Sequence, residues 1–141
     1  MAELFIDASN RIFGRLGSFV AKQALLGNVV RVFNCELAIM SGNPRYVVEK
    51  YRYRIRETGT PFKGPFIPRS PDMFLKRIIR GMLPHQTSRG REAHKRILFY
   101  IGVPDEFKNK SLQKLEFGDV KNLSTLKYIT IKDLCLSLGG K

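Results

Sequence analysis

The chain has 141 residues, a length at which we expect one domain spanning residues 1–141 with its own hydrophobic core. Hydrophobic residues make up 43% and charged residues 26% of the sequence, which excludes a disordered or collagen-like chain. The formal net charge is +13, with 25 basic and 12 acidic residues. An excess of this size repels itself in a compact chain and favours a polyanionic partner, nucleic acid ahead of an anionic membrane surface.

Several classes of protein are not expected from this sequence. The first residues lack the basic segment and apolar stretch of a signal peptide, and no apolar run approaches the ~18 residues of a membrane span. Cys35 and Cys135 lie too far apart for a metal site or a disulfide framework, so we expect both to be buried as small hydrophobic residues. We therefore predict a cytoplasmic protein that binds no metal, no cofactor and no membrane.

The outer parts of the chain are typical of an α/β scaffold. Four short apolar runs predict β-strands, at residues 4–6, 29–33, 97–101 and 128–131. Between the first two runs, apolar residues recur at helical spacing, namely Leu16, Phe19, Val20 and Ala24. Gly27 and Asn28 would end this helix. Continuous apolar strands that alternate with helices are typical of a parallel sheet covered on both faces.

The next segment carries two competing patterns. Asn43 and Pro44 are typical of the N-cap and first residue of a helix. One face of that helix would carry Val47, Val48, Tyr51 and Ile55. Residues 51–56 also alternate strictly between apolar and basic side chains, which is a strand signal. The N-cap and the length of the pattern favour the helix.

A loop and a second helix follow. Residues 58–70 hold three prolines and two glycines, a density of breakers that predicts a long loop. Ser70 and Pro71 then begin a helix that Pro84 closes. The helix has an apolar stripe made of Phe74, Leu75, Ile78, Ile79 and Met82. Lys76, Arg77 and Arg80 fall opposite this stripe, and a second basic stretch, residues 89–96, leads into the third strand.

Positive charge is concentrated in residues 45–96, called the basic segment below. The segment holds 14 basic and 4 acidic residues, a net charge of +10, against +1 for residues 1–44 and +2 for residues 97–141. A solvated helix face normally mixes both signs, whereas arginines with few acidic partners suit contacts with phosphate. The residues expected to contact phosphate are Arg77, Arg80, Arg89 and Arg91. Those expected to hold their helix on the sheet are Phe74, Ile78 and Met82.

The sequence offers little for catalysis. Residues 14–18 stand at a helix start, but they form neither a dinucleotide fingerprint nor a P-loop, so a tight strand–helix junction is the favoured interpretation. His85 and His94 lie in the basic segment without an expected catalytic partner. Asp7, at the end of the first strand, is expected to cap the following turn. We therefore predict that the protein is not an enzyme and has no small-molecule substrate.

Three stretches of the sequence carry a family resemblance. The first is Asp7-Ala8 with Gly14-Arg15-Leu16 and Ser18-Phe19-Val20-Ala21. The second is Val32-Phe33-Asn34-Cys35-Glu36 followed by Ile39-Met40-Ser41-Gly42-Asn43. The third is Arg80-Gly81-Met82-Leu83-Pro84, then Gly90, then Ile97-Leu98-Phe99-Tyr100-Ile101-Gly102. In this order they resemble the family of ribosomal large-subunit protein thirteen. The absence of an N-terminal extension and the end at Lys141 are similar to its archaeal members.

The resemblance implies a fold and a partner. The fold would be a three-layer α/β/α domain around a four-stranded parallel sheet. The partner would be the ribosomal RNA of the large subunit, bound as a structural constituent that supports assembly, with neighbouring ribosomal proteins such as protein three. The candidate RNA-binding residues are Arg15, Arg45, Arg52, Arg56, Lys63, Arg69, Lys76, Arg77, Arg80, His85, Arg89, Arg91, Lys95 and Arg96.

Two alternatives stay open at this point. One is another nucleic-acid protein, such as a translational regulator that acts away from the ribosome or a basic DNA-binding protein. It would be found largely free of ribosomes. The other is a small nucleotide-using enzyme, whose melting temperature a nucleotide would raise because a ligand of the native state stabilises it.

Overall fold

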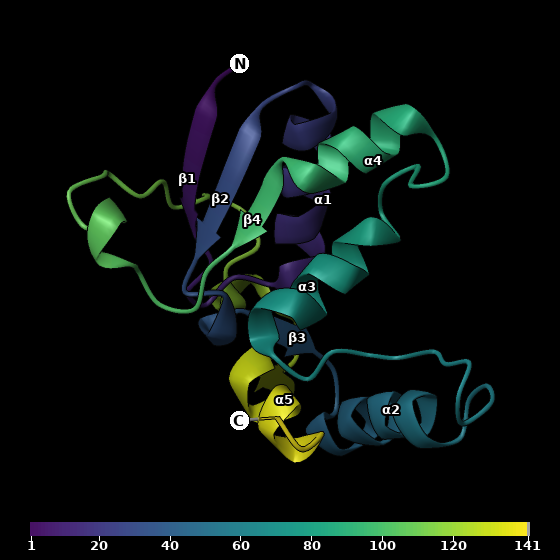
Figure 1. The fold of residues 1–141 in the computed structure, drawn as a ribbon. Coiled ribbons are helices and arrows are strands. Elements are labelled where there is room, and N and C mark those ends of the chain that lie inside the picture. The colour runs from purple at the N-terminus through teal and green to yellow at the C-terminus, as the bar shows by residue number, and fades with distance from the viewer. Residues whose placement is uncertain (141) are drawn as a thin grey trace.

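Three parallel strands form the central sheet of the computed structural model, which describes residues 1–140 (Figure 1). β1 (Glu3–Asp7) lies beside β2 (Val29–Phe33), and β2 lies beside β4 (Ile97–Phe99). Both pairs are parallel. These strands confirm the first three apolar runs as β-structure, although β4 ends earlier than the run that predicts it.

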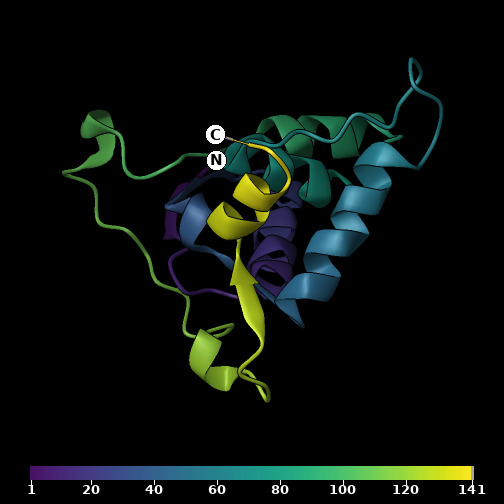
Figure 2. The ribbon, with the colours of Figure 1, turned by 90° about the horizontal axis from the view of Figure 1, so that it is seen from below.

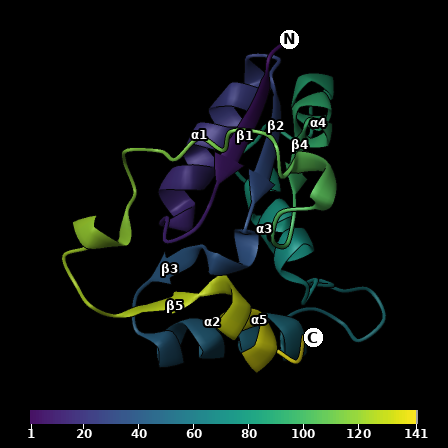
Figure 3. The same ribbon diagram turned by 90° about the vertical axis from the view of Figure 1, so that its left-hand side faces the viewer.

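The prediction of a fourth parallel strand is wrong. β5 (Tyr128–Thr130) pairs antiparallel with β3 (Ile39–Ser41) in a separate two-stranded sheet, which lies below the central sheet in Figure 3. Along β5, Tyr128 is exposed and Ile129 is buried, the alternation of a strand with one buried face. A strand inside a parallel sheet needs two apolar faces. The parallel sheet of the described residues therefore has three strands instead of four.

Helices cover one face of the central sheet, and an irregular segment covers the other (Figure 1). α1 (Phe13–Leu25), α3 (Pro71–Arg80) and α4 (Ser88–Lys95) pack on the first face. On the second face the ring of Phe33 lies 5.3 Å from the ring of Phe107, which belongs to the chain that follows β4. Aromatic packing by this irregular segment takes the place of the expected second layer of helices.

α1 confirms the helix predicted between the first two strands. Three of its four predicted core residues are buried, namely Leu16, Val20 and Ala24. The fourth, Phe19, is half-buried and meets the ring of Phe117 at a centroid distance of 5.6 Å. Just beyond α1, Gly27 has a φ of +100°, a left-handed conformation that glycine adopts without steric cost. The chain therefore turns there toward β2.

The interpretation of residues 43–56 as a helix is also confirmed. α2 spans Pro44–Arg56, and the side chain of Asn43 caps it by accepting a hydrogen bond from the backbone N–H of Arg45 at 3.1 Å. The proline at the first helical position has no N–H to leave unpaired. Both sequence features that favoured a helix over a strand are thus present in the structure.

α2 lies at the edge of the molecule, beside α5 (Ile131–Ser137) (Figure 2). Val47 is its one fully buried side chain, and the ring of Tyr51 meets that of Phe74 in α3 edge-on, with centroids 5.1 Å apart. The predicted loop, residues 58–70, leads from α2 to α3 and projects beyond both helices. α2 and this loop therefore depend on few contacts with the core.

α3 is held on the sheet by a slightly different set of residues from the predicted one. Phe74, Leu75 and Ile79 are 1% exposed or less. Ile78 is only half-buried, and Met82 lies past the end of the helix with 38% of its surface exposed. The role expected of Phe74 is confirmed, whereas Ile79 takes the central place expected of Ile78.

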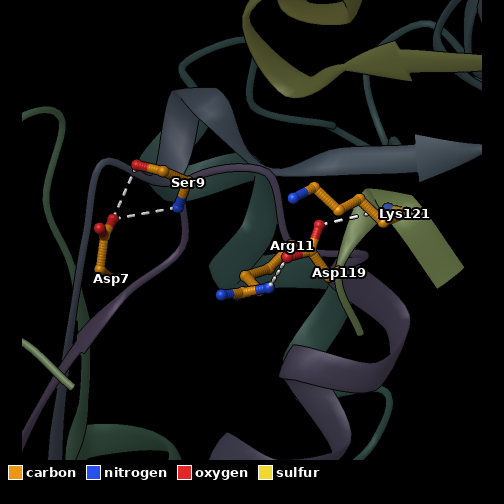
Figure 4. Close-up of polar contacts among 5 residues, drawn as sticks. All are labelled: Asp7, Ser9, Arg11, Asp119 and Lys121. Carbon is orange, nitrogen blue, oxygen red and sulfur yellow. Dashed lines mark hydrogen bonds and ion pairs between the residues drawn. The ribbon is translucent and has the colours of Figure 1, made fainter. Parts of the chain in front are cut away.

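Asp7 organises the turn after β1, as the sequence predicts. Its Oδ1 accepts hydrogen bonds from the backbone N–H of Ser9 at 3.0 Å, from Ser9 Oγ at 2.7 Å and from Asn34 Nδ2 at 3.0 Å; Figure 4 shows the contacts with Ser9. Burial by itself raises the pKa of Asp7, but the hydrogen bonds to its charged form outweigh burial and lower the pKa below its ordinary value of 3.8.

An ion pair fastens the C-terminal third to the loop before α1 (Figure 4). Arg11 Nη1 lies 2.7 Å from Asp119 Oδ2, and the side chain of Asp119 also accepts a hydrogen bond from the backbone N–H of Lys121 at 3.2 Å. Next to the pair, the N–H of Ile12 donates to the carbonyl of Gly118 at 2.6 Å. These contacts hold the irregular segment after β4 against α1.

A core truncation tests the packing of α3. Ile79→Ala should lower the free energy of unfolding by roughly 2–5 kcal/mol, because it empties space that is fully buried. Ile78→Ala removes a half-buried side chain and should cost about 1 kcal/mol. Denaturant unfolding of both variants beside the parent measures the difference, and equal losses would contradict the assignment.

A second prediction concerns acid stability. Because Asp7 has a lower pKa in the folded chain than in the unfolded one, its contribution is fully present above the ordinary pKa of 3.8 and is lost as the pH falls through the lowered folded value. Asp7→Asn should therefore be less stable than the parent at neutral pH, and the gap should narrow in strong acid. Urea midpoints of both proteins across this pH range provide the test. A gap that stays constant with pH would show that the carboxylate charge at Asp7 does not matter.

Candidate RNA interface

The basic segment presents its charge on α2, α3, α4 and the connections between these helices. Among the predicted RNA-binding residues, those that are half-buried are Lys76, Arg77 and Arg96. The others are exposed: Arg15, Arg45, Arg52, Arg56, Lys63, Arg69, Arg80, His85, Arg89, Arg91 and Lys95. Because these cations are already exposed and lie on neighbouring elements, they can contact the phosphates of one extended polyanion without a change in the fold.

Part of this charge surrounds a hollow beside α3. The hollow has a volume of about 230 Å³ and is lined by Pro68, Met73, Lys76, Arg77, Arg80 and His94. Three of these side chains are cations, and none is acidic. The structure therefore brings together three of the predicted site residues around a concave, positive surface that favours an anionic group.

Arg77 has a second task in this region. Its Nη1 donates a hydrogen bond to the backbone carbonyl of Phe66 at 3.1 Å, which ties the loop before α3 to the helix. Some of its hydrogen-bonding capacity is therefore used inside the chain. Arg80, which is exposed at the end of the same helix, is the better probe of contacts with an external anion.

Three further arginines predicted to bind RNA also have partners within the protein. Arg96 Nη1 donates to the carbonyl of Ala24 at the end of α1, at 3.2 Å. Arg52 Nη2 donates to the carbonyl of Ser137 at the end of α5, at 3.2 Å. These two guanidinium groups lie at helix C-termini, where the terminal carbonyl oxygens carry a partial negative charge, which explains the attraction. Arg45 pairs with Glu49 on the exposed side of α2 at 3.2 Å.

α4 was not predicted; sequence analysis gave only a basic stretch leading into β4. The helix spans Ser88–Lys95, and Thr87 caps it by accepting a hydrogen bond from the N–H of Gly90 at 3.2 Å. A side chain at Gly90 would collide with the backbone carbonyl of Pro84, so the turn from α3 needs a glycine there. Thr87, a residue type favoured at the N-cap, was the available signal. Arg89, Arg91 and Lys95 thus stand on a regular helix.

His94, which was not among the predicted site residues, joins α4 to α3. Its Nε2 lies 3.3 Å from the backbone carbonyl of Lys76. Burial, with smaller effects from the nearby cations Lys76 and Arg80, lowers the pKa of His94 below its ordinary value. His94 is therefore a neutral wall of the basic hollow at physiological pH, whereas His85 is exposed in the preceding turn.

The other predicted residues are spread over the surface. Arg15 on α1 packs beside Gly118, so it faces the C-terminal third of the chain. Arg69 lies next to Gly139, and Lys63 is near the tip of the loop. α2 carries two further exposed cations that were not among the predicted residues: Lys50, and Arg54, which lies over the ring of Tyr51.

The described residues include two cysteines and other residue types that can ligate metals. Cys35 and Cys135 are buried as predicted, and burial raises the pKa of Cys35 to about 12 and that of Cys135 to about 11, so neither is a thiolate at neutral pH. Within residues 1–140, no group of three or more histidine, cysteine or acidic side chains is placed to hold a metal ion. In the same part of the chain, every helix is too short or too polar to cross a membrane.

Comparison with known proteins adds the family. The model of the family described as "Ribosomal protein L13" matches residues 2–106. The protein named "Large ribosomal subunit protein uL13" of Methanococcoides burtonii is 43% identical over 136 residues, which cover 96% of this chain and 97% of that one. The protein of the same name from Methanosarcina barkeri is 42% identical over 137 residues, with the same shares covered. That from Methanopyrus kandleri is 43% identical over 136 residues, 95% of this chain and 85% of that one.

These matches bear directly on the resemblance found in the sequence. The family match spans all three motif stretches and stops at residue 106. The relatives named above are archaeal, as the resemblance implies, and their similarity extends over nearly the whole chain. The chain therefore belongs to the ribosomal protein L13 family.

Proposed function

We propose that this protein is a structural constituent of the large subunit of the cytoplasmic ribosome, where it binds ribosomal RNA through its basic segment and supports subunit assembly. The observation that carries this proposal is the similarity over almost the entire chain to proteins named for the large ribosomal subunit. The same family membership makes the chain a structural protein rather than an enzyme.

The charge distribution supports RNA as the main partner. The basic segment carries a net charge of +10, and many of its cations stand exposed on α2, α3, α4 and their connections. Contacts of this kind fix the position of a protein on a nucleic acid without reading its sequence. Arg80, Arg89 and Arg91 are exposed and, among the contacts of the described residues, have no acidic partner. We assign them to phosphate.

The remaining candidate cations have graded roles in this proposal. Arg56, Lys63, Arg69, Lys76, Lys95, His85 and Arg15 add contacts around the central group. Arg45, Arg52, Arg77 and Arg96 divide their hydrogen bonds between RNA and the protein's own chain. Neighbouring large-subunit proteins, protein three among them, would meet surfaces that RNA leaves free.

The proposal predicts where the protein is found. In sucrose gradients of salt-washed ribosomes it should accompany the large subunit at about one copy per particle and be absent from the small subunit. Quantitative mass spectrometry of each fraction measures this ratio. A protein recovered mainly in ribosome-free fractions would instead be a regulator that acts away from the ribosome.

A charge variant tests the interface itself. Arg80→Gln combined with Arg89→Gln should weaken binding to large-subunit RNA and reduce the slope of log affinity against log salt by about 1.4–1.8, since each neutralised phosphate contributes about 0.7–0.9. Both side chains are exposed, so the melting temperature should change little.

The matched control removes the same charge elsewhere. Lys127 and Lys132 are exposed and lie outside the basic segment, and their double change to glutamine should leave the slope nearly unchanged. Filter binding over a range of salt concentrations gives both slopes. Equal effects of the two double variants would mean that net charge alone, and not this surface, governs binding.

A further inference from the structure

Four aromatic rings that lie close together along the chain are largely exposed on the surface. They lie within residues 44–66, which comprise α2 and the first part of the following loop and are called the arm below. The exposed fractions are 65% for Tyr46, 57% for Tyr53, 94% for Phe62 and 69% for Phe66. Large rings so exposed, and so close along the chain, indicate a surface that a partner covers.

The two tyrosines of the arm lie on one largely exposed side of α2. Val47 is buried and Tyr51 is half-buried, so this side of α2 faces the core. Tyr46 and Tyr53 are seven residues apart, close to two helical turns, and therefore share one side of α2 at a separation of about 10 Å along its axis. That side is away from the buried one, and both rings are more than half exposed, with Tyr46 also bordering a hollow beside Met40 and Met82.

The loop presents Phe62 on a tight turn. The backbone N–H groups of Lys63 and Gly64 both donate to the carbonyl of Thr60, at 3.3 and 3.2 Å. Two residues beyond the turn, the hydrogen bond from Arg77 holds the carbonyl of Phe66. The backbone on both sides of the ring is thus fixed, which lowers the entropy that binding would cost. Figure 2 shows this loop projecting from the molecule beyond α2.

Positive charge surrounds these rings. The arm contains six basic residues, Arg45, Lys50, Arg52, Arg54, Arg56 and Lys63, and two acidic ones, Glu49 and Glu57. Aromatic faces interspersed with cations match a nucleotide whose base is free to stack and whose phosphate is negative. A duplex presents phosphates but keeps its bases stacked on each other, so it would leave the rings without a partner.

We propose that the arm binds unpaired nucleotides of RNA, with Tyr53 and Phe62 as stacking platforms for bases and with Arg54 and Arg56 beside them for phosphate. This inference rests on the proposed function, because it takes RNA as the partner of the basic segment and assigns the single-stranded part of that RNA to the arm. α3 and α4 display cations with few exposed rings, so they serve the phosphates of paired regions.

The test compares two RNA probes. Tyr53→Leu combined with Phe62→Leu should weaken binding to a single-stranded oligoadenylate by roughly tenfold or more, since one stacked base contributes about 1–3 kcal/mol and 1.4 kcal/mol is tenfold. Binding to an RNA duplex of the same length should stay within about twofold. The salt slope should not change, because no cation is removed.

A matched control and a direct readout accompany this variant. Tyr128→Leu removes a ring that is 40% exposed on β5, outside the arm, and should leave both affinities unchanged. Phe62→Trp gives the chain its one tryptophan. Its fluorescence should be quenched by oligoadenylate, which places a base against the ring, and not by the duplex.

The outcomes separate this inference from the proposed function. If the leucine variant binds both probes like the parent, or if the tryptophan is not quenched, the stacking role is wrong even where Arg80 and Arg89 still prove essential. If the leucine variant binds RNA normally but fails to enter the subunit, a protein covers the arm and the inference is wrong. If the unaltered protein is absent from large subunits yet its arm stacks on oligoadenylate, the proposed function fails and the inference stands.

Discussion

The contact between Tyr51 and Phe74 fixes the position of much of the basic segment. Phe74 is buried, and α3 around it packs on β4 and on the turn after β2. The ring of Tyr51 meets this ring edge-on with the two centroids 5.1 Å apart, a favourable geometry for two aromatic rings. The guanidinium group of Arg54 lies over the ring of Tyr51. Because α2 fully buries little besides Val47, this contact, together with the packing of α2 on α5 and β5, sets where α2 and the following loop stand relative to the sheet.

The carbonyl groups at the C-terminal ends of helices need hydrogen-bond donors, and in this basic chain some of the arginines supply them. Arg52 and Arg96 bind the terminal carbonyls of α5 and α1, and Arg77 binds a loop carbonyl next to α3. Arg52 and Arg96 join segments far apart in the sequence, whereas Arg77 joins α3 to the loop just before it. Arginine suits both tasks because its planar fork offers several donors at once. Charge counts along the sequence cannot separate these arginines from Arg80 or Arg89, since the difference lies in the distant carbonyls that folding brings close.

Sequence patterns predicted correctly those features that depend on interactions between residues close together in the chain. The cap at Asn43, the stripe of α1 and the turn at Asp7 each depend on residues a few positions away, and each is present in the structure. The predicted pairing of the fourth strand was wrong because strand pairing depends on contacts between distant parts of the chain. Residues 128–130 do form a strand, but it pairs with β3, which was not predicted as a strand. α4 was missed because its apolar side consists of little more than Gly90 and Ala93, too small a stripe to recognise.

The surface divides into two kinds of positive area, and the division follows from what folding leaves exposed. On α3 and α4 the large apolar residues are largely buried, so the exposed groups are mostly cations on long stems, which suit phosphates along a helix backbone. On α2 and its loop, few core contacts are available, and rings such as Tyr53 and Phe62 remain outside among the cations. Rings left in water lower the solubility of the free protein, so their cost is offset only in a complex that covers them. The two kinds of area therefore differ in the chemistry they offer to a polyanion: mainly cations on α3 and α4, and cations with rings on α2 and its loop.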